Sequence, residues 1–120
     1  MTGETSPDLG ISEELSALRW IDDHCHVHHR GAPADQVASL VEDAGAGGVE
    51  RLITVGCDIE DSRAAIAAAA AHENVFATAG VHPHEARHGI DGLEELLADP
   101  DVVAVGECGL DYFYEHSPRD

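Results

Sequence analysis

The stretch Leu52-Ile-Thr-Val-Gly56 begins the part of the sequence that decides the fold. A β-branched, apolar run that ends in glycine is typical of a buried strand. Residues 58–71 follow, rich in alanine and acidic in the first turn, which predicts a helix. Val75-Phe-Ala-Thr-Ala79 is a second apolar run of strand length. Strand, helix and strand in this order predict a parallel β-α-β unit.

The same alternation continues upstream of this unit. Residues 19–23 form a predicted strand that ends at His24. From Pro33, apolar residues recur at the spacing of one helical face, and the glycines at 45–48 stop the predicted helix. Its predicted core face consists of Val37, Leu40, Val41 and Ala44. Residues 1–18 are predicted to be an N-terminal extension, in which Ser12 caps a short helix.

Downstream, Asp91 and Glu94 resemble the capping box of a helix that ends before Pro100. Its predicted apolar face consists of Leu93, Leu96 and Leu97. Residues 102–105 form a further apolar run of strand length. Strands alternating with helices predict an α/β fold whose parallel sheet is buried on both faces. Residues 19–120 therefore form one predicted domain, either about half of an eight-unit β/α barrel or one small flavodoxin-like sheet.

Charge restricts the partners of this domain. The chain has 24 Asp and Glu against 6 basic residues, all of them arginine, which gives a formal net charge of -18. Such a surface repels phosphate backbones and anionic membranes, so a basic nucleic-acid surface of the usual kind is absent. An anionic substrate would need a bound cation. A salt-adapted or GC-rich proteome would explain the acidity without any functional meaning.

Cysteine usage and hydropathy indicate an intracellular globular protein. The 3 cysteines are widely spaced and contain no C-x-x-C pair, which argues against a disulfide framework and a thiolate zinc site. No apolar run reaches the length of a membrane span, and the N-terminus lacks the features of a signal peptide. A cytoplasmic location is expected.

Polar clusters follow the predicted strands. His24 and His26 alternate along an extended chain, so both imidazoles face the same way, which suits two ligands on one metal ion. Asp22 and Asp23 can accept the second ring N–H of a ligating imidazole. Glu107 follows the fourth strand between two glycines, which permit close approach of a ligand to the backbone.

Two further groups remain open to several interpretations. His82 and His84 flank Pro83 and can be metal ligands, donors to an anionic substrate or parts of a structural loop. Asp111 can orient a neighbour, contact substrate or cap the next turn. Because the carboxyl ends of parallel strands meet at one edge of a sheet, all these side chains are expected at one ligand-binding edge.

Four segments together resemble the ordered signatures of the TatD family of metal-dependent hydrolases, which belongs to the amidohydrolase-like barrel enzymes. The resemblance extends from about Arg19 to the end of the chain. It implies a (β/α)8 barrel, one or two divalent ions (Zn, Mn or Mg) and 3'-5' exonuclease hydrolysis of DNA phosphodiesters. The segments are Ile21-Asp-Asp-His-Cys-His26, Val55-Gly-Cys-Asp-Ile-Glu-Asp-Ser-Arg63, Gly80-Val-His-Pro-His84 and Val105-Gly-Glu-Cys-Gly-Leu-Asp-Tyr112.

The resemblance also implies roles for single residues. His24 and His26 match first-strand metal ligands, and Glu107 matches a catalytic carboxylate that bridges two metal ions. His82 and His84 match a loop beside the site. Asp111 matches a recurrent acid of the family. His82, His84 and Asp111 are therefore candidate substrate-binding residues.

Family barrels have about 250 residues, and later histidines and an aspartate complete their metal site. None of these follows here, so the chain is expected to be the N-terminal half of the barrel, with open edges that favour self-association. DNA contacts would depend on Arg30, Arg87 and Arg119. The alternatives are an amide or ester hydrolase, such as an aminoacyl-tRNA deacylase, and a non-catalytic truncated product.

Overall fold

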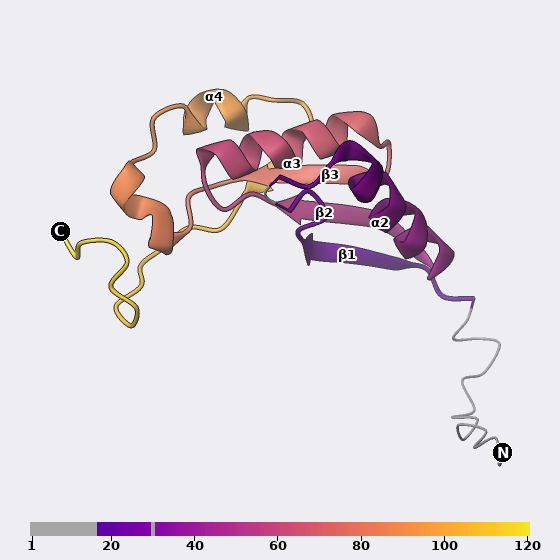
Figure 1. Ribbon diagram of the computed structural model, residues 1–120, viewed down its shortest axis with the longest axis horizontal. Helices are drawn as coiled ribbons and strands as arrows, with labels where there is room; N and C mark the ends of the chain where they lie inside the picture. The colour runs from indigo at the N-terminus through magenta and orange to yellow at the C-terminus, as the bar shows by residue number, and fades with distance from the viewer. Residues whose placement is uncertain (1–16, 30) are drawn as a thin grey trace, which may run out of the picture.

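The computed structural model describes residues 17–29 and 31–120, and its strands form one parallel sheet (Figure 1). The predicted N-terminal helix near Ser12 lies outside the described residues. The sheet follows chain order, so each connection is a β-α-β crossover, as predicted. The strands are β1 (Trp20–Cys25), β2 (Val49–Val55), β3 (Val75–Ala79) and β4 (Val102–Val105). The helices are α2 (Ala34–Ala46), α3 (Ile59–Ala71), the 3₁₀ helix η1 (Pro83–His88) and α4 (Leu93–Leu97).

The bounds of β3 and β4 agree with the sequence prediction, whereas β1 and β2 are longer. β1 was expected to end before His24, but it continues because Cys25 pairs with Thr54 of β2. The pairing is irregular between Asp22 and Cys25. His24 therefore lies within the strand, and His26 is the first residue beyond it.

The core lies between the sheet and its helices, which cover one side of it in Figure 1. It is built from small side chains, including Val37 and Val41 of α2 and Ala65 and Ala68 of α3. Leu40 was predicted to join this face and is instead exposed. The other members of the core are Val27, Leu52, Ala69, Val75 and Ala77.

The prediction of burial on both faces is wrong for the outer strands. Trp20 and Ile21 of β1 are 54% and 59% exposed, and Val103 and Val105 of β4 are 50% and 60% exposed. β3, between β2 and β4, is almost entirely buried. In the described part of the chain, the helices therefore protect the middle of the sheet and leave apolar residues of β1 and β4 in contact with solvent.

Helix capping adds one contact that the sequence did not predict and corrects one prediction. Asp58 caps α3, because its side chain accepts a hydrogen bond from the backbone N–H of Asp61 at 2.7 Å. The predicted capping box at Asp91 does not form. Gly92 is the residue before α4, and its φ of 90° is a left-handed conformation that favours glycine. Asp91 therefore precedes the N-cap residue, and its side chain does not cap α4.

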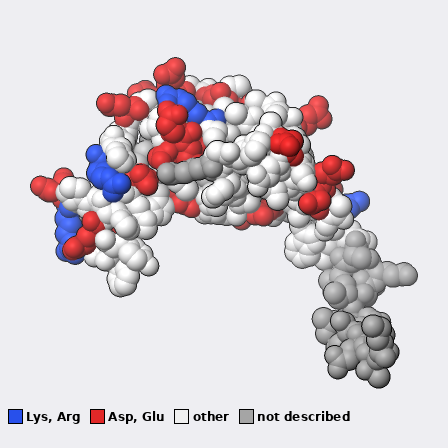
Figure 2. All heavy atoms as spheres, viewed as in Figure 1, with Lys and Arg blue, Asp and Glu red and all other residues white. Residues whose placement is uncertain are grey.

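The surface is acidic, and Figure 2 shows Asp and Glu around the visible face with few arginines between them. The 3 cysteines all lie in the described ranges and are free thiols, as expected. In the same ranges, none of the helices combines the length and the hydropathy needed to cross a membrane.

Candidate metal centre

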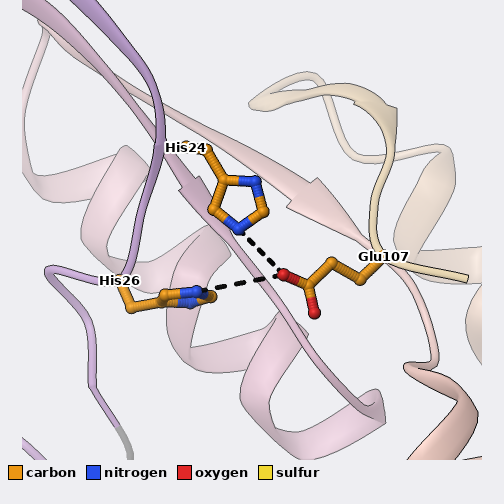
Figure 3. Close-up of side chains that lie close together, drawn as sticks. All are labelled: His24, His26 and Glu107. Carbon is orange, nitrogen blue, oxygen red and sulfur yellow. Dashed lines mark ion pairs between the residues drawn. The ribbon is translucent and has the colours of Figure 1, made fainter.

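The carboxyl ends of β1 and β4 bring together three predicted site residues that are far apart in sequence. His24 Nε2 lies 2.8 Å from Glu107 Oε1, and His26 Nε2 lies 4.0 Å from the same oxygen. Figure 3 shows both imidazoles pointing toward this carboxylate. The three potential ligand atoms all lie within 4.8 Å of one another.

These donors fit a divalent cation. Imidazole nitrogen and carboxylate oxygen are common ligands of zinc and other divalent metals. Ligands about 2.1 Å from one ion stand roughly 3 to 4.2 Å apart, depending on the angle between them. The distances of 2.8 and 4.0 Å to Glu107 are close to this range. Because the side chains of His24 and His26 are 54% and 41% exposed, solvent and substrate can also reach the cluster.

A backbone carbonyl orients the ring of His26. Its Nδ1 lies 2.8 Å from the carbonyl oxygen of Val55, so Nδ1–H donates and the lone pair of Nε2 faces Glu107. The sequence had suggested Asp22 or Asp23 as the acceptor. Asp22 instead accepts the backbone N–H of His24 at 3.1 Å.

Two glycines allow the close approach of β3 and β4 that positions Glu107. A Cβ atom at Gly80 would lie 2.6 Å from the carbonyl oxygen of Glu107, and one at Gly106 would lie 2.5 Å from Thr78 Oγ1. Gly106 was predicted to permit the approach of a ligand, but it permits the approach of β3. Gly109 has a φ of 131° and open space around it, so glycine is favoured there by the backbone conformation and not by a close neighbour.

His82 lies beside the cluster as a donor. Its Nδ1 accepts the backbone N–H of His84 at 3.1 Å, so in the neutral ring the proton is on Nε2. That Nε2 lies 3.7 Å from Glu107 Oε2. Of the roles that the sequence left open for His82, this tautomer favours a donor to an anionic group.

His84 pairs with Asp111, its Nε2 lying 2.5 Å from Asp111 Oδ2. Asp111 also accepts the backbone N–H groups of Phe113 and Tyr114, at 2.8 and 3.2 Å. These hydrogen bonds, with that of Phe113 foremost, lower the pKa of the Asp111 carboxyl. Asp111 thus both caps a turn and orients a neighbour, two of the roles left open by the sequence.

Aromatic rings continue outward from this pair. The ring centroid of His84 lies 4.4 Å from that of His82 and 5.4 Å from that of Tyr114, which lies 4.7 Å from Phe113. The rings of Phe113 and Tyr114 are exposed. We call residues 112–114 the aromatic segment; sequence reasoning did not single out its rings.

One of the arginines suggested for nucleic-acid contacts lies beside the aromatic segment, and another contacts residues that follow it. The Arg119 guanidinium stands 5.1 Å from the ring centroid of Tyr112. Arg87 donates to the carbonyl of His116 at 2.6 Å. Arg30, the third arginine, lies outside the described residues. The aromatic segment therefore has exposed rings and one neighbouring guanidinium, which also pairs with Glu115 at 3.2 Å.

Sequence reasoning also missed a buried group next to the cluster. His28 Nε2 lies 3.0 Å from Asp61 Oδ1, and both side chains are almost completely buried. The thiol of Cys57 lies 3.6 Å from Glu107 Oε2, and burial, followed by the charges of Glu107 and Asp61, raises its pKa to about 12. The signal in the sequence was the third alternate histidine, His-x-His-x-His, at residues 24–28.

Known proteins are similar to this chain in sequence and in fold. The profile of the family described as TatD related DNase matches residues 21–120. An uncharacterized metal-dependent hydrolase TatD of Mycobacterium tuberculosis is 42% identical over 99 residues, which are 78% of this chain and 38% of that protein. The 3'-5' ssDNA/RNA exonuclease TatD of Escherichia coli K12 is 39% identical over 82 residues, 65% of this chain and 30% of that protein.

Two solved structures are similar. A TatD family hydrolase from Entamoeba histolytica superposes with a TM-score of 0.68 at 25% identity, over 80% of this chain and 39% of that one. The TatD homologue YJJV from Escherichia coli K12 superposes with a TM-score of 0.64 at 34% identity, over 81% of this chain and 39% of that one. The chain thus spans 30% to 39% of the length of these four proteins. The four parallel β/α units confirm the predicted fold class, the N-terminal half of a (β/α)8 barrel. The chain belongs to the TatD family.

Proposed function

We propose that this chain supplies one part of the active site of a divalent-metal-dependent phosphodiesterase that hydrolyses single-stranded nucleic acid, DNA in particular, from the 3' end. The observation that carries the proposal is the convergence of His24 and His26 on one oxygen of Glu107. One or two divalent cations held by these residues would supply a Lewis acid and lower the pKa of a water molecule to about 7.

Glu107 presents its two oxygens to different neighbours. Oε1 faces His24 and His26, whereas Oε2 faces His82 and the thiol of Cys57. Oε1 would hold a cation together with the two imidazoles, and a second cation at Oε2 would take the place of the N–H and S–H groups that face this oxygen. Glu107 is therefore the proposed bridging ligand, and His24 and His26 are the proposed ligands on the Oε1 side.

The neighbouring histidines are proposed to take part in binding the phosphate group of the substrate. His82 carries its proton on Nε2, directed toward the side of Glu107 away from the two ligands. Asp111 holds the ring of His84 against it, which fixes the orientation of that side chain. The Nε2–H of His82 can stabilise the negative charge of a phosphoryl group. The neutral ring of His84 directs its N–H at Asp111, so its proposed part is to position the loop that carries His82.

A nucleic-acid substrate has two supports. Relatives are named as ssDNA/RNA exonucleases, so RNA belongs to the proposal together with DNA. The aromatic segment offers exposed rings on which unpaired bases can stack, with Arg119 beside it. Stacking of this kind does not need the basic groove that this acidic chain lacks.

The experiment is a binding and cleavage assay with the wild-type chain and a double variant, His24→Ala with His26→Ala. A fluorescent single-stranded oligodeoxynucleotide, the matching oligoribonucleotide and a duplex of equal length are titrated in Mn²⁺ and in EDTA. We expect Mn²⁺ to strengthen single-strand binding by the wild type but not by the double variant, and any products to be mononucleotides from the 3' end. Equal binding with and without Mn²⁺ for the wild type would refute the proposal.

A further inference from the structure

A buried polar group lies beneath the proposed metal ligands and has no part in the function proposed above. His28 and Asp61 are 3% and 5% exposed, and Thr54 is 0% exposed. His28 Nδ1 lies 2.5 Å from Thr54 Oγ1, and its Nε2 lies 3.0 Å from Asp61 Oδ1 without the alignment of a hydrogen bond. Burying ionisable groups costs stability unless they are paired, so their presence in a core of alanine and valine calls for an explanation.

Asp61 connects this group to the residues around Glu107. Its Oδ2 accepts the backbone N–H of Cys57 at 2.8 Å. The carbonyl of Cys57 accepts the backbone N–H of His82 at 2.8 Å, and its thiol lies 3.6 Å from Glu107 Oε2. Asp61 therefore fixes Cys57, which contacts both His82 and Glu107.

His28 connects the same group to His26. The two residues belong to the segment that leaves β1, and Val27 between them is buried. The ring of His28 lies between Thr54 of β2 and Asp61 of α3, which holds this segment against the end of β2. The next residue of β2, Val55, provides the carbonyl that orients His26.

We infer that Asp61 and His28 are positioning residues for the cluster of His24, His26 and Glu107. Together they hold the segments that follow β1 and β2 in the arrangement in which the three ligand atoms converge. The inference rests on the proposed function for the identity of the cluster as a metal site. The contacts of Asp61 and His28 exist without any metal ion, so they can be tested separately.

The first test compares Mn²⁺ affinity among three variants by calorimetry, well below the melting temperature of each. Asp61→Ala removes the acceptor for Cys57 N–H, and we expect affinity to fall about 10- to 100-fold. Asp61→Asn keeps an oxygen for Cys57 and turns its NH2 group to His28, which then accepts at Nε2 and donates from Nδ1 to Thr54, so it should recover most of the affinity. Val75→Ala is the matched control, since Val75 is 2% exposed at the start of β3, at the opposite end from the site. It should lower the melting temperature without changing affinity.

The second test uses the metal-free protein. Nitrogen-15 spectra of the imidazoles report the proton on His26 Nδ1, which donates to Val55. We expect this signal to shift in Asp61→Ala and to stay unchanged in Val75→Ala. Thr54→Val is a smaller change that should also shift the signal, and it replaces Asp61→Ala if that variant does not fold. A wild type that binds no Mn²⁺ refutes the proposed function and leaves this second test standing. Unchanged His26 signals in Asp61→Ala or Thr54→Val overturn the inference.

Discussion

His24 and Glu107 lie at the ends of the first and fourth strands, with Nε2 of His24 2.8 Å from Oε1 of Glu107. This contact exists because the strands run parallel and end at the same edge, so residues from distant parts of the chain meet there. The carboxylate is 23% exposed. Its position depends on how closely β4 approaches β3, and this dependence gives the first prediction.

Gly80→Ala should displace Glu107. The added methyl group would lie 2.6 Å from the carbonyl oxygen of Glu107, and a backbone atom cannot move aside as a flexible side chain can. We expect a loss of about 1 to 3 kcal/mol in the free energy of unfolding, measured by urea denaturation, and weaker Mn²⁺ binding. Gly45→Ala is the control, because Gly45 lies in α2 with nothing near its Cβ position. It should stabilise the chain by about 0.5 to 1 kcal/mol. A neutral Gly80→Ala would contradict the role given to this glycine.

Asp111 should stay ionised to a lower pH than an ordinary aspartate. Hydrogen bonds from Phe113 and Tyr114 and the contact with His84 lower its pKa below 3.8. A lowered pKa in the folded state means that the stabilisation is present above the unfolded value and is lost as pH falls through the folded value. Carbon-13 titration of the carboxyl group measures this pKa. A pKa at or above 3.8 would show that these hydrogen bonds do not form in solution.

The aromatic segment should bind unpaired bases. Phe113→Ala and Tyr114→Ala each remove an exposed ring, and we expect each to weaken single-strand binding by about 1 to 3 kcal/mol in fluorescence anisotropy. Trp20→Ala is the control, because Trp20 is aromatic and 54% exposed but begins β1, at the opposite edge of the sheet. If all three variants bind alike, the aromatic segment does not contact the strand.

The exposed outer strands should cause self-association. β1 and β4 present unpaired edges and exposed apolar residues, which favour pairing between chains. We expect sedimentation velocity to show oligomers of the wild type and a shift toward monomer for Ile21→Lys or Val103→Lys. Leu40→Lys, on the outer side of α2, should not alter the distribution. A wild type that is monomeric at every concentration would contradict this prediction.

The sequence predicted the helices and strands better than it predicted which of their faces are buried and which side chains contact one another. Apolar runs with clear ends defined β3 and β4, and the rule that parallel strands end at one edge predicted that His24, His26 and Glu107 lie close together, as they do. Periodicity does not report which faces are covered, so the apolar runs alone predicted burial on both faces. The exposure of β1 and β4 agrees instead with the open edges expected of half a barrel. The carbonyl of Val55 that orients His26 leaves no mark in the sequence. Asp61 was interpreted only as an acid in the first turn of a helix, because that common pattern hides its buried contact with His28.

The most direct test of the account is calorimetric titration of Mn²⁺ or Zn²⁺ into the wild type and Glu107→Gln, at a pH where imidazoles are neutral. The substitution keeps the size of the side chain and removes the charge that faces His24 and His26. His72→Gln, at the far end of α3, is the matched control. We predict a site in the wild type and in His72→Gln that Glu107→Gln weakens by at least about tenfold. Equal affinity in all three proteins would contradict the assignment of this cluster as a metal centre.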